Sequence, residues 1–460
     1  MNAVIAYVRS LNPQLPRPVW LIEAGGVANA LGNGIVIPFL VIYLHGVRHF
    51  GLGISGLVVA CLLGIGIVGS PLAGRVVDRI GARATLMGSL AFLAAGYGGF
   101  PFVHHPWQAF GLALIAGTGN AGFAPSHSSL LAALTSREQR TAAYALTRVT
   151  DNLGFGFGGL IGGLIATTAV PVSFDVLFAV DAGTFLAFIG LLFFVPAVRA
   201  PAAVVTGGFR RVARDHTFVV LLGLTAVLVA AAYAQVATIL PPYANEHAGV
   251  SPAGIGVVFF VNTIVLVIAQ LPIAKALEGR RRFPALALTA ALFAVTCATI
   301  LVVGRSLHGS AAVVALCGMI VVFSLAECIH GAVNNPLIAD LAPPELMGRY
   351  MGLRTSAFQL GYLAGPTLGS LMLATSTSGL WLGSAGACLA ASAGFLVLGH
   401  QAPSDIDVTP GAARAPRQAF RVLWRTSDMT TEDPLSTDAQ PAPHQAPDAT
   451  HAHTGGSSTA

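Results

Sequence analysis

The chain has 460 residues, of which 55% are hydrophobic and only 9% carry a charge, and its mean hydropathy is +0.74. About a quarter of the residues of a soluble globular domain are charged, so this composition excludes a soluble protein and indicates an integral membrane protein. The net charge of +5 does not indicate a nucleic-acid partner, because the basic residues are distributed as membrane topology requires.

Apolar runs separated by short charged segments recur along the chain before residue 400. Each run is long enough for a helix to cross a hydrocarbon core about 30 Å thick, and backbone in lipid must satisfy its own hydrogen bonds. The dyad alternation of a membrane β-barrel is absent. The pattern predicts an all-α membrane protein with twelve transmembrane helices at residues 18–45, 51–74, 84–104, 107–133, 141–168, 174–198, 217–243, 251–275, 284–304, 311–339, 350–375 and 379–400.

Basic residues cluster in alternate loops between these spans. If the N-terminus is cytoplasmic, the outward loops carry only Arg48 and Arg305. This asymmetry follows the positive-inside rule and predicts that both termini lie in the cytoplasm. The inward loops and their flanks carry Arg75, Arg79, Arg83, Arg137, Arg140, Arg148, Arg199, Arg210, Arg211, Arg214, Lys275, Arg280, Arg281, Arg282, Arg349 and Arg354.

An internal repeat divides the chain into two halves. Residues 73–86 and 273–286, which follow the second and eighth spans, align at an offset of 200 residues, with Glu278 opposite Asp78. Two six-span halves in the same orientation form a transporter architecture with the substrate site between them. The expected parts are a cytoplasmic N-terminus (1–17), an N-terminal six-helix bundle (18–198), a central cytoplasmic loop (199–216), a C-terminal six-helix bundle (217–400) and a disordered cytoplasmic tail (401–460).

The loop after the second span carries a spaced motif, Gly74, Asp78, Arg79, Gly81 and Arg83. It matches every defined position of the signature Gly-x-x-x-Asp-Arg-x-Gly-x-Arg, so residues 18–400 resemble a transporter of the major facilitator superfamily. In physical terms, glycine allows close helix packing and sharp turns, and a carboxylate is stabilised at a helix N-terminus.

Asp78 is therefore expected to meet a helix N-terminus or an arginine such as Arg354, and Glu278 is its counterpart in the second half. Such contacts would latch the cytoplasmic ends of the two halves together in one conformational state. The alternative is that the motif charges only orient the loop.

Glycines also recur in the fifth span, at Gly154, Gly158, Gly159, Gly162 and Gly163. They resemble the antiporter signature of the drug:proton branch of the superfamily, although Gly159 stands where the signature has proline. Glycines four residues apart line one helix face and allow close contact, so ordinary helix packing is an equally good interpretation. The resemblance implies export rather than import.

The fourth span lacks the arginine that the family carries there. The stretch FAPSHSSLLAAL that follows is similar to the equivalent stretch of MdtH-type multidrug exporters, with Ala124 and His127 where an acidic and a basic residue are expected. Proton coupling in this chain must therefore use a different partner.

The resemblance also implies that spans 1, 4, 7 and 10 line a central cavity, and each of them carries polar residues. The candidates for proton coupling and substrate binding are Glu23, Asn29 and Asn33 in span 1, Asn120 and His127 in span 4, Tyr233 and Gln235 in span 7, and Glu327, His330 and Asn334 in span 10.

Glu327, His330 and Asn334 lie three and four residues apart, so they face one side of a helix. A bare charge in mid-membrane costs about 2.5–3.5 kcal/mol on insertion scales, so Glu327 needs a partner, water or a proton, and His330 is the expected proton partner. Glu23 lies only about five residues into its span and has an alternative, which is to reach toward the interface.

Two further acidic residues lie within predicted spans. Asp151 follows Arg148 by three residues, and an intrahelical salt bridge is expected between them. Asp181 in span 6 is a weaker candidate for a proton relay.

These features predict a secondary transporter that exports amphipathic or cationic drugs by alternating access as protons enter. Glu23 and Glu327 would carry the coupling, with His127 and His330 as proton partners. Spans 1, 4, 7 and 10 contain no Arg or Lys, which favours neutral or cationic cargo. We expect a monomer in the inner (plasma) membrane, with small-molecule substrate, protons and the lipid bilayer as its partners.

Two other functions fit the same sequence. One is a symporter that imports a small neutral solute such as a sugar, and the other is a non-transporting membrane protein with the same fold. An enzyme is not expected, because no P-loop, HExxH or GxSxG motif occurs in a suitable context. The five cysteines lie in predicted spans without metal-ligand spacing, so neither a metal nor a cofactor is expected.

Overall fold

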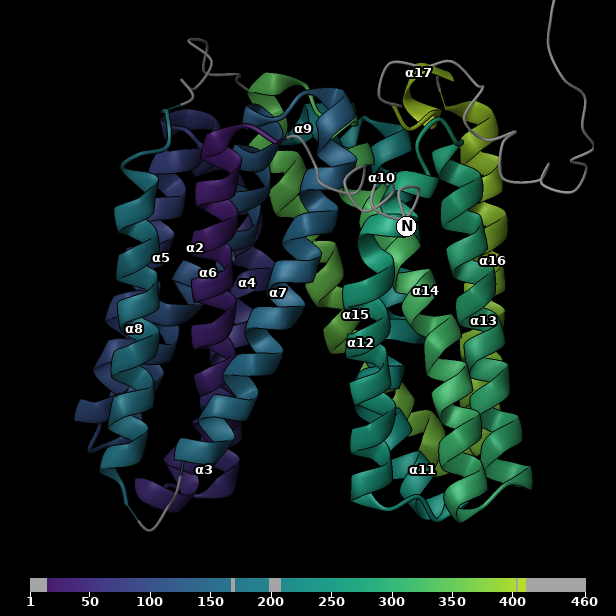
Figure 1. Ribbon diagram of the computed structural model, residues 1–460, viewed down its shortest axis with the longest axis horizontal. Helices are drawn as coiled ribbons and strands as arrows, with labels where there is room; N and C mark the ends of the chain where they lie inside the picture. Colours follow the sequence, from purple (N-terminus) through teal and green to yellow (C-terminus); the bar gives the residue numbers. More distant parts are fainter. Residues whose placement is uncertain (1–14, 167–169, 198–207, 403, 411–460) are drawn as a thin grey trace, which may run out of the picture. The chain divides into compact units, whose positions relative to one another are not determined.

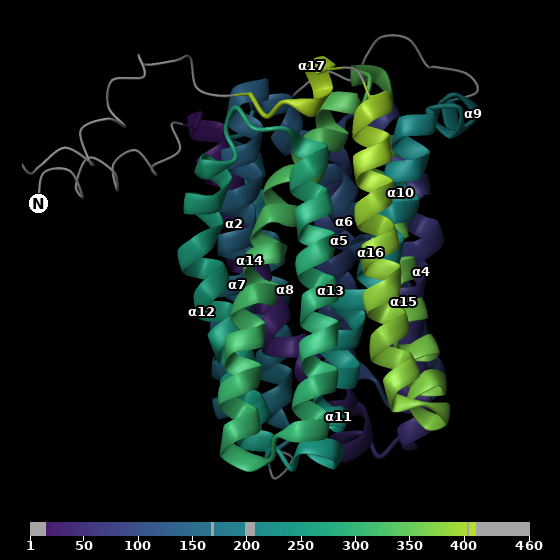
Figure 2. The ribbon, with the colours of Figure 1, turned by 90° about the vertical axis from the view of Figure 1, so that its right-hand side faces the viewer.

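The computed structural model describes residues 15–166, 170–197, 208–402 and 404–410. In these ranges the chain forms long helices that run side by side (Figure 1, Figure 2), and the one β contact found there is a bridge between Arg281 and Val408. The predicted N-terminal segment up to residue 14, most of the central loop and the tail from residue 411 onward lie outside the described residues.

The N-terminal half, as we call helices α2 to α8, begins with a continuous helical segment. It consists of α2 (Arg17–Val36), η1 (Ile37–Phe39), α3 (Leu40–Ile42) and η2 (Tyr43–Val47). The remaining elements are α4 (Leu52–Ile80), α5 (Ala82–Gly99), η3 (Phe100–Phe102), α6 (Pro106–Leu134), α7 (Arg137–Ile165) and α8 (Val172–Leu192).

The C-terminal half, helices α10 to α16, follows the short helix α9 (Gly208–Ala213). Its first segment is continuous from α10 (His216–Leu228) through η4 (Val229–Tyr233) and η5 (Gln235–Ile239) into α11 (Leu240–Ala248). Then come α12 (Pro252–Ala276), α13 (Arg282–Ser306), α14 (Gly309–Leu341), η6 (Pro344–Leu346), α15 (Met347–Thr375), α16 (Thr377–Gln401) and α17 (Ser404–Asp407).

Each predicted span coincides, within about six residues at either end, with one long helical segment, and the prediction of an all-α fold is confirmed. In the described part of the chain, 8 helical segments are long and apolar enough to cross a membrane. They are Arg17–Val47, Gly53–Ile80, Val172–Leu192, His216–Ala248, Ala253–Ala276, Arg282–Ser306, Gly309–Leu341 and Thr377–Gln401. The long helices α5, α6, α7 and α15 are outside this group, and they carry more small, polar and charged residues.

Local sequence explains where several helices start. Ser136 and Gln139 form a capping box at the start of α7, Asp215 accepts a hydrogen bond from the backbone N–H of Phe218 in α10, and Ser251 accepts one from Gly254 in α12. Such side chains satisfy N–H groups that have no partner in the first helical turn.

Two apolar cores organise the packing. One is formed within the N-terminal half. The other lies mainly in the C-terminal half and also includes Val19, Leu131, Ala132, Ala143 and Tyr144 from the N-terminal half. The halves meet where α4 packs on α15, α7 packs on α12 and α14, and α6 packs on α15.

The contact between α4 and α15 depends on glycine. A Cβ atom on Gly74 would lie 2.1 Å from the carbonyl oxygen of Gly348, and one on Gly348 would lie 2.2 Å from that of Gly74. The hydroxyl of Ser356 also donates to the carbonyl of Ile67 across 2.6 Å. These residues lie in the second half of α4 and the first half of α15, toward what we call the motif end, where α4 ends and α15 begins. Figure 1 shows the two halves diverging toward the opposite end, near α3 and α11.

The chain after α16 forms the short helix α17 and is described again over residues 404–410, so the expectation of a disordered tail does not hold for these residues. The carboxylate of Asp407 accepts from the side chain of Arg281 at 2.5 Å and from the backbone N–H of Phe283 at 3.0 Å. Backbone hydrogen bonds of 2.9 Å join Thr409 to Gly279 and Arg280. The chain that follows α16 thus caps the start of α13, a pairing between distant segments that local composition does not reveal.

Gly74→Ala should weaken the contact between α4 and α15, because the added Cβ atom forces the two backbones apart. Overpacking of this kind costs about 1–3 kcal/mol. Gly64→Ala is the matched control on the same helix, since a Cβ atom there meets nothing within 4 Å. Thermal unfolding in detergent should show a lower midpoint for Gly74→Ala alone, and equal midpoints for both variants would contradict the close contact.

Candidate functional site

The motif carboxylate Asp78 lies at the N-terminus of α15. Its Oδ1 accepts a hydrogen bond of 2.6 Å from the backbone N–H of Gly348, and its Oδ2 lies 3.5 Å from Nη1 of Arg349. Both charged side chains are buried, with exposed fractions of 4% and 5%. The arginine partner is thus Arg349 and not Arg354, because Arg349 follows Gly348 directly and reaches the end of α4, whereas Arg354 lies more than one turn farther into α15.

The other motif residues have separate structural roles. Gly81 has φ 93° and connects α4 to α5, a backbone conformation that favours glycine. Arg83 donates to the carbonyl of Phe193 after α8, at 3.2 Å, while Arg79 is exposed. Glu278 is also exposed and its carboxylate forms no ion pair in the described part of the chain, so the repeat does not extend to a second contact like that of Asp78.

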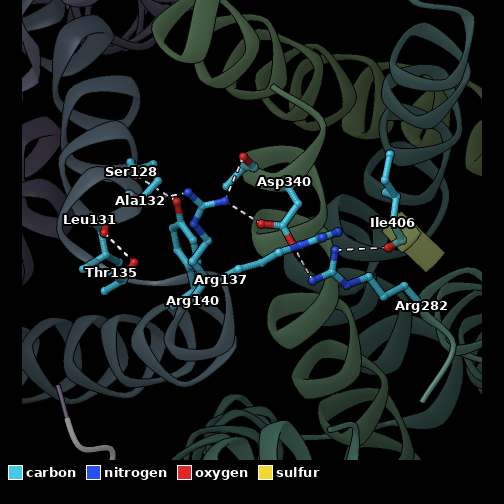
Figure 3. Close-up of polar contacts among 11 residues, drawn as sticks. Ser128, Leu131, Ala132, Thr135, Arg137, Arg140, Arg282, Asp340 and Ile406 are labelled. Carbon is cyan, nitrogen blue, oxygen red and sulfur yellow. Dashed lines mark hydrogen bonds and ion pairs between the residues drawn. The ribbon is translucent and has the colours of Figure 1, made fainter. Parts of the chain in front are cut away.

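A second charged cluster lies at the motif end, and its centre is Asp340, which was not among the residues expected from the sequence (Figure 3). The Asp340 carboxylate is completely buried and lies 3.1 Å from Nε of Arg137, 2.5 Å from Nη1 of Arg140 and 2.6 Å from Nη2 of Arg282. Arg137 and Arg140 begin α7 in the N-terminal half, whereas Asp340 and Arg282 belong to the C-terminal half. The cluster therefore joins the two halves through charge.

Backbone carbonyl groups complete this cluster. Arg140 donates to the carbonyl of Ala339 at 3.0 Å and to that of Ala132 at 3.2 Å, and Arg282 donates to the carbonyl of Ile406 at 3.2 Å. Figure 3 shows these side chains converging on Asp340 from both halves. The positive-inside rule accounted for these arginines as cytoplasmic loop residues. The one sequence feature that pointed to their partner was a carboxylate, Asp340, at the very end of an apolar span.

The deeper carboxylate Glu327 also bridges the two halves. Its Oε1 lies 2.9 Å from Nη2 of Arg148 on α7, and its Oε2 accepts from Nδ2 of Asn262 on α12 at 2.9 Å. Arg148 therefore forms its ion pair with Glu327 and not with Asp151, which corrects the expected intrahelical pair. Arg148 reaches Glu327, which is 179 residues away in the sequence, because α7 and α14 pack together.

His330 and Glu327 form no hydrogen bond or ion pair in the described part of the chain, although the two lie on one helix face. Nδ1 of His330 lies 3.1 Å from the hydroxyl of Tyr233 on η4, so Tyr233 is its partner. Asn334 is 1% exposed, and neither its amide nitrogen nor its amide oxygen has a hydrogen-bond partner in the described part of the chain. The structure thus brings Tyr233, His330 and Asn334 to one region of the interface.

Glu23 is buried between α2 and α7, where its carboxylate is held by hydrogen bonds. It is 2% exposed and accepts hydrogen bonds from Thr147 at 2.6 Å and from Thr150 at 3.0 Å. His127 stacks on Phe123 with ring centroids 5.5 Å apart and forms no hydrogen bond with Glu23, since its Nε2 has no partner among the described residues. The expected proton pair between Glu23 and His127 is therefore not formed.

The remaining cavity candidates are dispersed. Gln235 donates to the carbonyl of Gly365 at 2.8 Å and to that of Ala230 at 3.1 Å, so it faces α15. Asn29 is buried on α2, while Asn33 and Asn120 are half-buried.

The glycines of α7 serve the contact with α2. Added Cβ atoms at Gly154, Gly158 and Gly162 would approach α2 or η1 atoms to 2.7, 2.1 and 2.6 Å. Gly159 and Gly163 would make only ordinary contacts, at 3.9 and 3.6 Å. Close helix packing within the N-terminal half accounts for three of these five glycines.

A cavity of about 170 Å³ lies where α6, α7, α14 and α15 meet. Its lining includes His127, Arg148, His330, Asn334 and Arg354. Two arginines thus border it, from helices other than those expected to line the pathway. Their presence removes the argument for neutral or cationic cargo, which rested on spans 1, 4, 7 and 10 alone.

Comparison with known proteins identifies relatives of this chain. The family model described as Major Facilitator Superfamily matches residues 24–249 and 221–431. The uncharacterized MFS-type transporter YqjV of Bacillus subtilis is 25% identical over 362 residues, which cover 77% of this chain and 86% of YqjV. The multidrug resistance protein MdtH of Edwardsiella ictaluri is 27% identical over 366 residues, covering 74% of this chain and 83% of MdtH.

Solved structures share the fold. A bacterial homologue of the iron transporter ferroportin, crystallised in an outward-facing state, superimposes with a TM-score of 0.70 at 14% identity. The match covers 84% of this chain and 100% of that one.

Asp340→Asn should destabilise the protein, because it leaves the buried guanidinium of Arg282, which is 1% exposed, without a counter-charge. Removing one partner of a buried ion pair costs about 3–5 kcal/mol. Glu345→Gln is the control, since it breaks the pair with Arg211 in which the side chains are 60% and 30% exposed, and such pairs are worth about 0–1 kcal/mol. Chemical unfolding in detergent measures the free energy of unfolding of both variants. Equal decreases in that free energy would show that the burial of Asp340 does not matter.

Proposed function

Because the chain belongs to the major facilitator superfamily, whose members are multi-pass membrane transporters and not enzymes, we propose that it exports amphipathic drugs in exchange for protons by alternating access. MdtH relatives at 27–29% identity are named multidrug resistance proteins, which supports a drug as cargo. The observation that carries proton coupling is the ion pair between Arg148 and Glu327, because it joins the two halves that must move apart.

The proposal includes a topology. All twelve long helical segments cross the inner membrane of a monomer, and both termini are cytoplasmic, as the distribution of basic residues supports. The motif end is then the cytoplasmic end. α4 packs on α15 at that end, and the halves diverge at the other end, so in the proposed topology this arrangement corresponds to an outward-facing state.

The sign of coupling follows from the charges. Ionised Glu327 attracts Arg148 across the interface and stabilises the state that is closed to the cytoplasm. A proton entering from outside neutralises Glu327 and weakens this attraction, which favours opening toward the cytoplasm. On the cytoplasmic side Glu327 releases its proton and the drug binds. The protein then returns to the outward-facing state, in which ionised Glu327 pairs with Arg148 again. Inward proton movement thus drives outward drug movement.

Glu327→Gln should abolish this exchange, because an amide keeps the shape of the side chain but cannot take up a proton. In inverted vesicles that contain the protein, drug-induced proton release should fall to the level of empty vesicles. Glu246→Gln is the matched control, because Glu246 is exposed near the end of α11, and it should leave the signal unchanged. Proton release that persists in both Glu327→Gln and Glu23→Gln would refute coupling at these carboxylates.

Drug export is tested in a bacterial host that lacks its own exporters. The intact protein should raise resistance to several amphipathic drugs, and Asp78→Asn should lose most of that gain. Asparagine can still accept from Gly348, but it cannot neutralise Arg349, whose burial makes the lost ion pair costly, about 3–5 kcal/mol. Immunoblotting of membranes controls for expression. If resistance changes for no compound, the proposal of drug export is wrong, and uptake assays with neutral solutes become the next test.

A further inference from the structure

Arg354 borders the cavity where α6, α7, α14 and α15 meet, and it lacks a counter-charge. The guanidinium carbon of Arg354 lies 5.6 Å from the ring centroid of Phe358, and within the described ranges this side chain forms no ion pair. Its Nε atom is buried without an acceptor. An arginine at this depth is costly unless an anion or water satisfies it.

Other hydrogen-bonding groups of the cavity are unsatisfied as well. Asn334 is 1% exposed and uses neither its amide nitrogen nor its amide oxygen. Nε of Arg148 and Nε2 of His330 also have no partner in the part of the chain that the structure describes. A buried polar group without a partner is destabilising by roughly 1–3 kcal/mol, so a ligand that offers hydrogen-bond partners to this set of groups would be bound favourably.

The charges around the cavity indicate the sign of that ligand. Glu327 already neutralises Arg148 at 2.9 Å, which leaves Arg354 as the cation available from the C-terminal half. Asp151 also borders the cavity, but it is on α7 of the N-terminal half, is exposed and forms no ion pair with Arg354. An anionic group fits the side formed by α14 and α15.

We propose that this cavity binds a carboxylate group of the transported molecule, with Arg354 as its ion-pair partner and the Asn334 amide as a second donor. Arginine matches a carboxylate in both charge and geometry. The volume of about 170 Å³ admits the acidic end of an amphipathic molecule, and the remainder extends along the interface between the halves. This inference names the substrate class of the proposed function and rests on it only in assuming that the bound molecule is transported.

Two dyes with the same skeleton test the proposal. Rhodamine 110 carries a free carboxylate, and rhodamine 123 is its methyl ester. Fluorescence polarisation with the purified full chain in lipid nanodiscs should show that the acid binds about tenfold or more tightly than the ester, as a charge-assisted contact allows. Arg354→Gln should abolish this preference, and Arg354→Lys should restore part of it. Arg214→Gln removes an exposed arginine and should change nothing.

Several outcomes would overturn the proposal: equal affinities for the two dyes, a preference for the ester, no binding of either dye to the wild-type protein, or an unchanged preference in Arg354→Gln. If Arg354→Gln does not fold, the wild-type protein decides the question, because benzoate should displace rhodamine 110 and neutral benzamide should not. The binding assay uses no proton gradient, so its result is independent of the proton-release assay on Glu327→Gln, and either proposal can fail alone.

Discussion

Asp340 can remain buried only while arginines from both halves of the molecule reach it. A carboxylate removed from water without compensation is unstable, and here Arg137 and Arg140 of α7 supply the compensation together with Arg282 of α13. Helix packing alone would tolerate gradual separation of the halves. Because Asp340 must be either paired with arginines or hydrated, the contact between the halves is nearly all-or-none. At any intermediate separation its charge would be neither paired nor fully hydrated.

Buried carboxylates are held by groups of the opposite half at two places along the interface between the halves. At the motif end, Asp78 and Asp340 are held by the start of α15 and by the start of α7. Farther in, Glu327 is held by Arg148. The outer contacts border a cavity of about 590 Å³ whose lining includes Asp78, Arg140 and Asp340, whereas Arg148 of the inner pair borders the separate cavity that contains Arg354 and Asn334. The contacts between the halves and the proposed binding site thus use different residues, so we expect a ligand at the inner site to influence the pair of Arg148 and Glu327 without displacing the outer contacts.

Sequence patterns predicted the helices well because an apolar run of sufficient length has only one stable conformation in lipid. They also led to the expectation that Asp78 meets a helix N-terminus, although its partner Gly348 lies 270 residues away, because the match to a known motif, and not local spacing, carried that expectation. They did not predict the partners of Arg148, Asp340 or His330, because those pairs join helices far apart in the sequence. The positive-inside rule contributed to this failure: it gave Arg148 a sufficient explanation as a loop-flanking residue and so concealed its role inside the bundle.

Residues 404–410, which follow α16, take part in the contacts around Asp340 between the two halves. Ile406 and Asp407 bind Arg282 and Arg281, and Arg282 in turn binds Asp340. The first turn of α13 therefore has its electrostatic partner some 124 residues downstream. A change in the contacts of Ile406 therefore reaches Asp340 through a single side chain, that of Arg282.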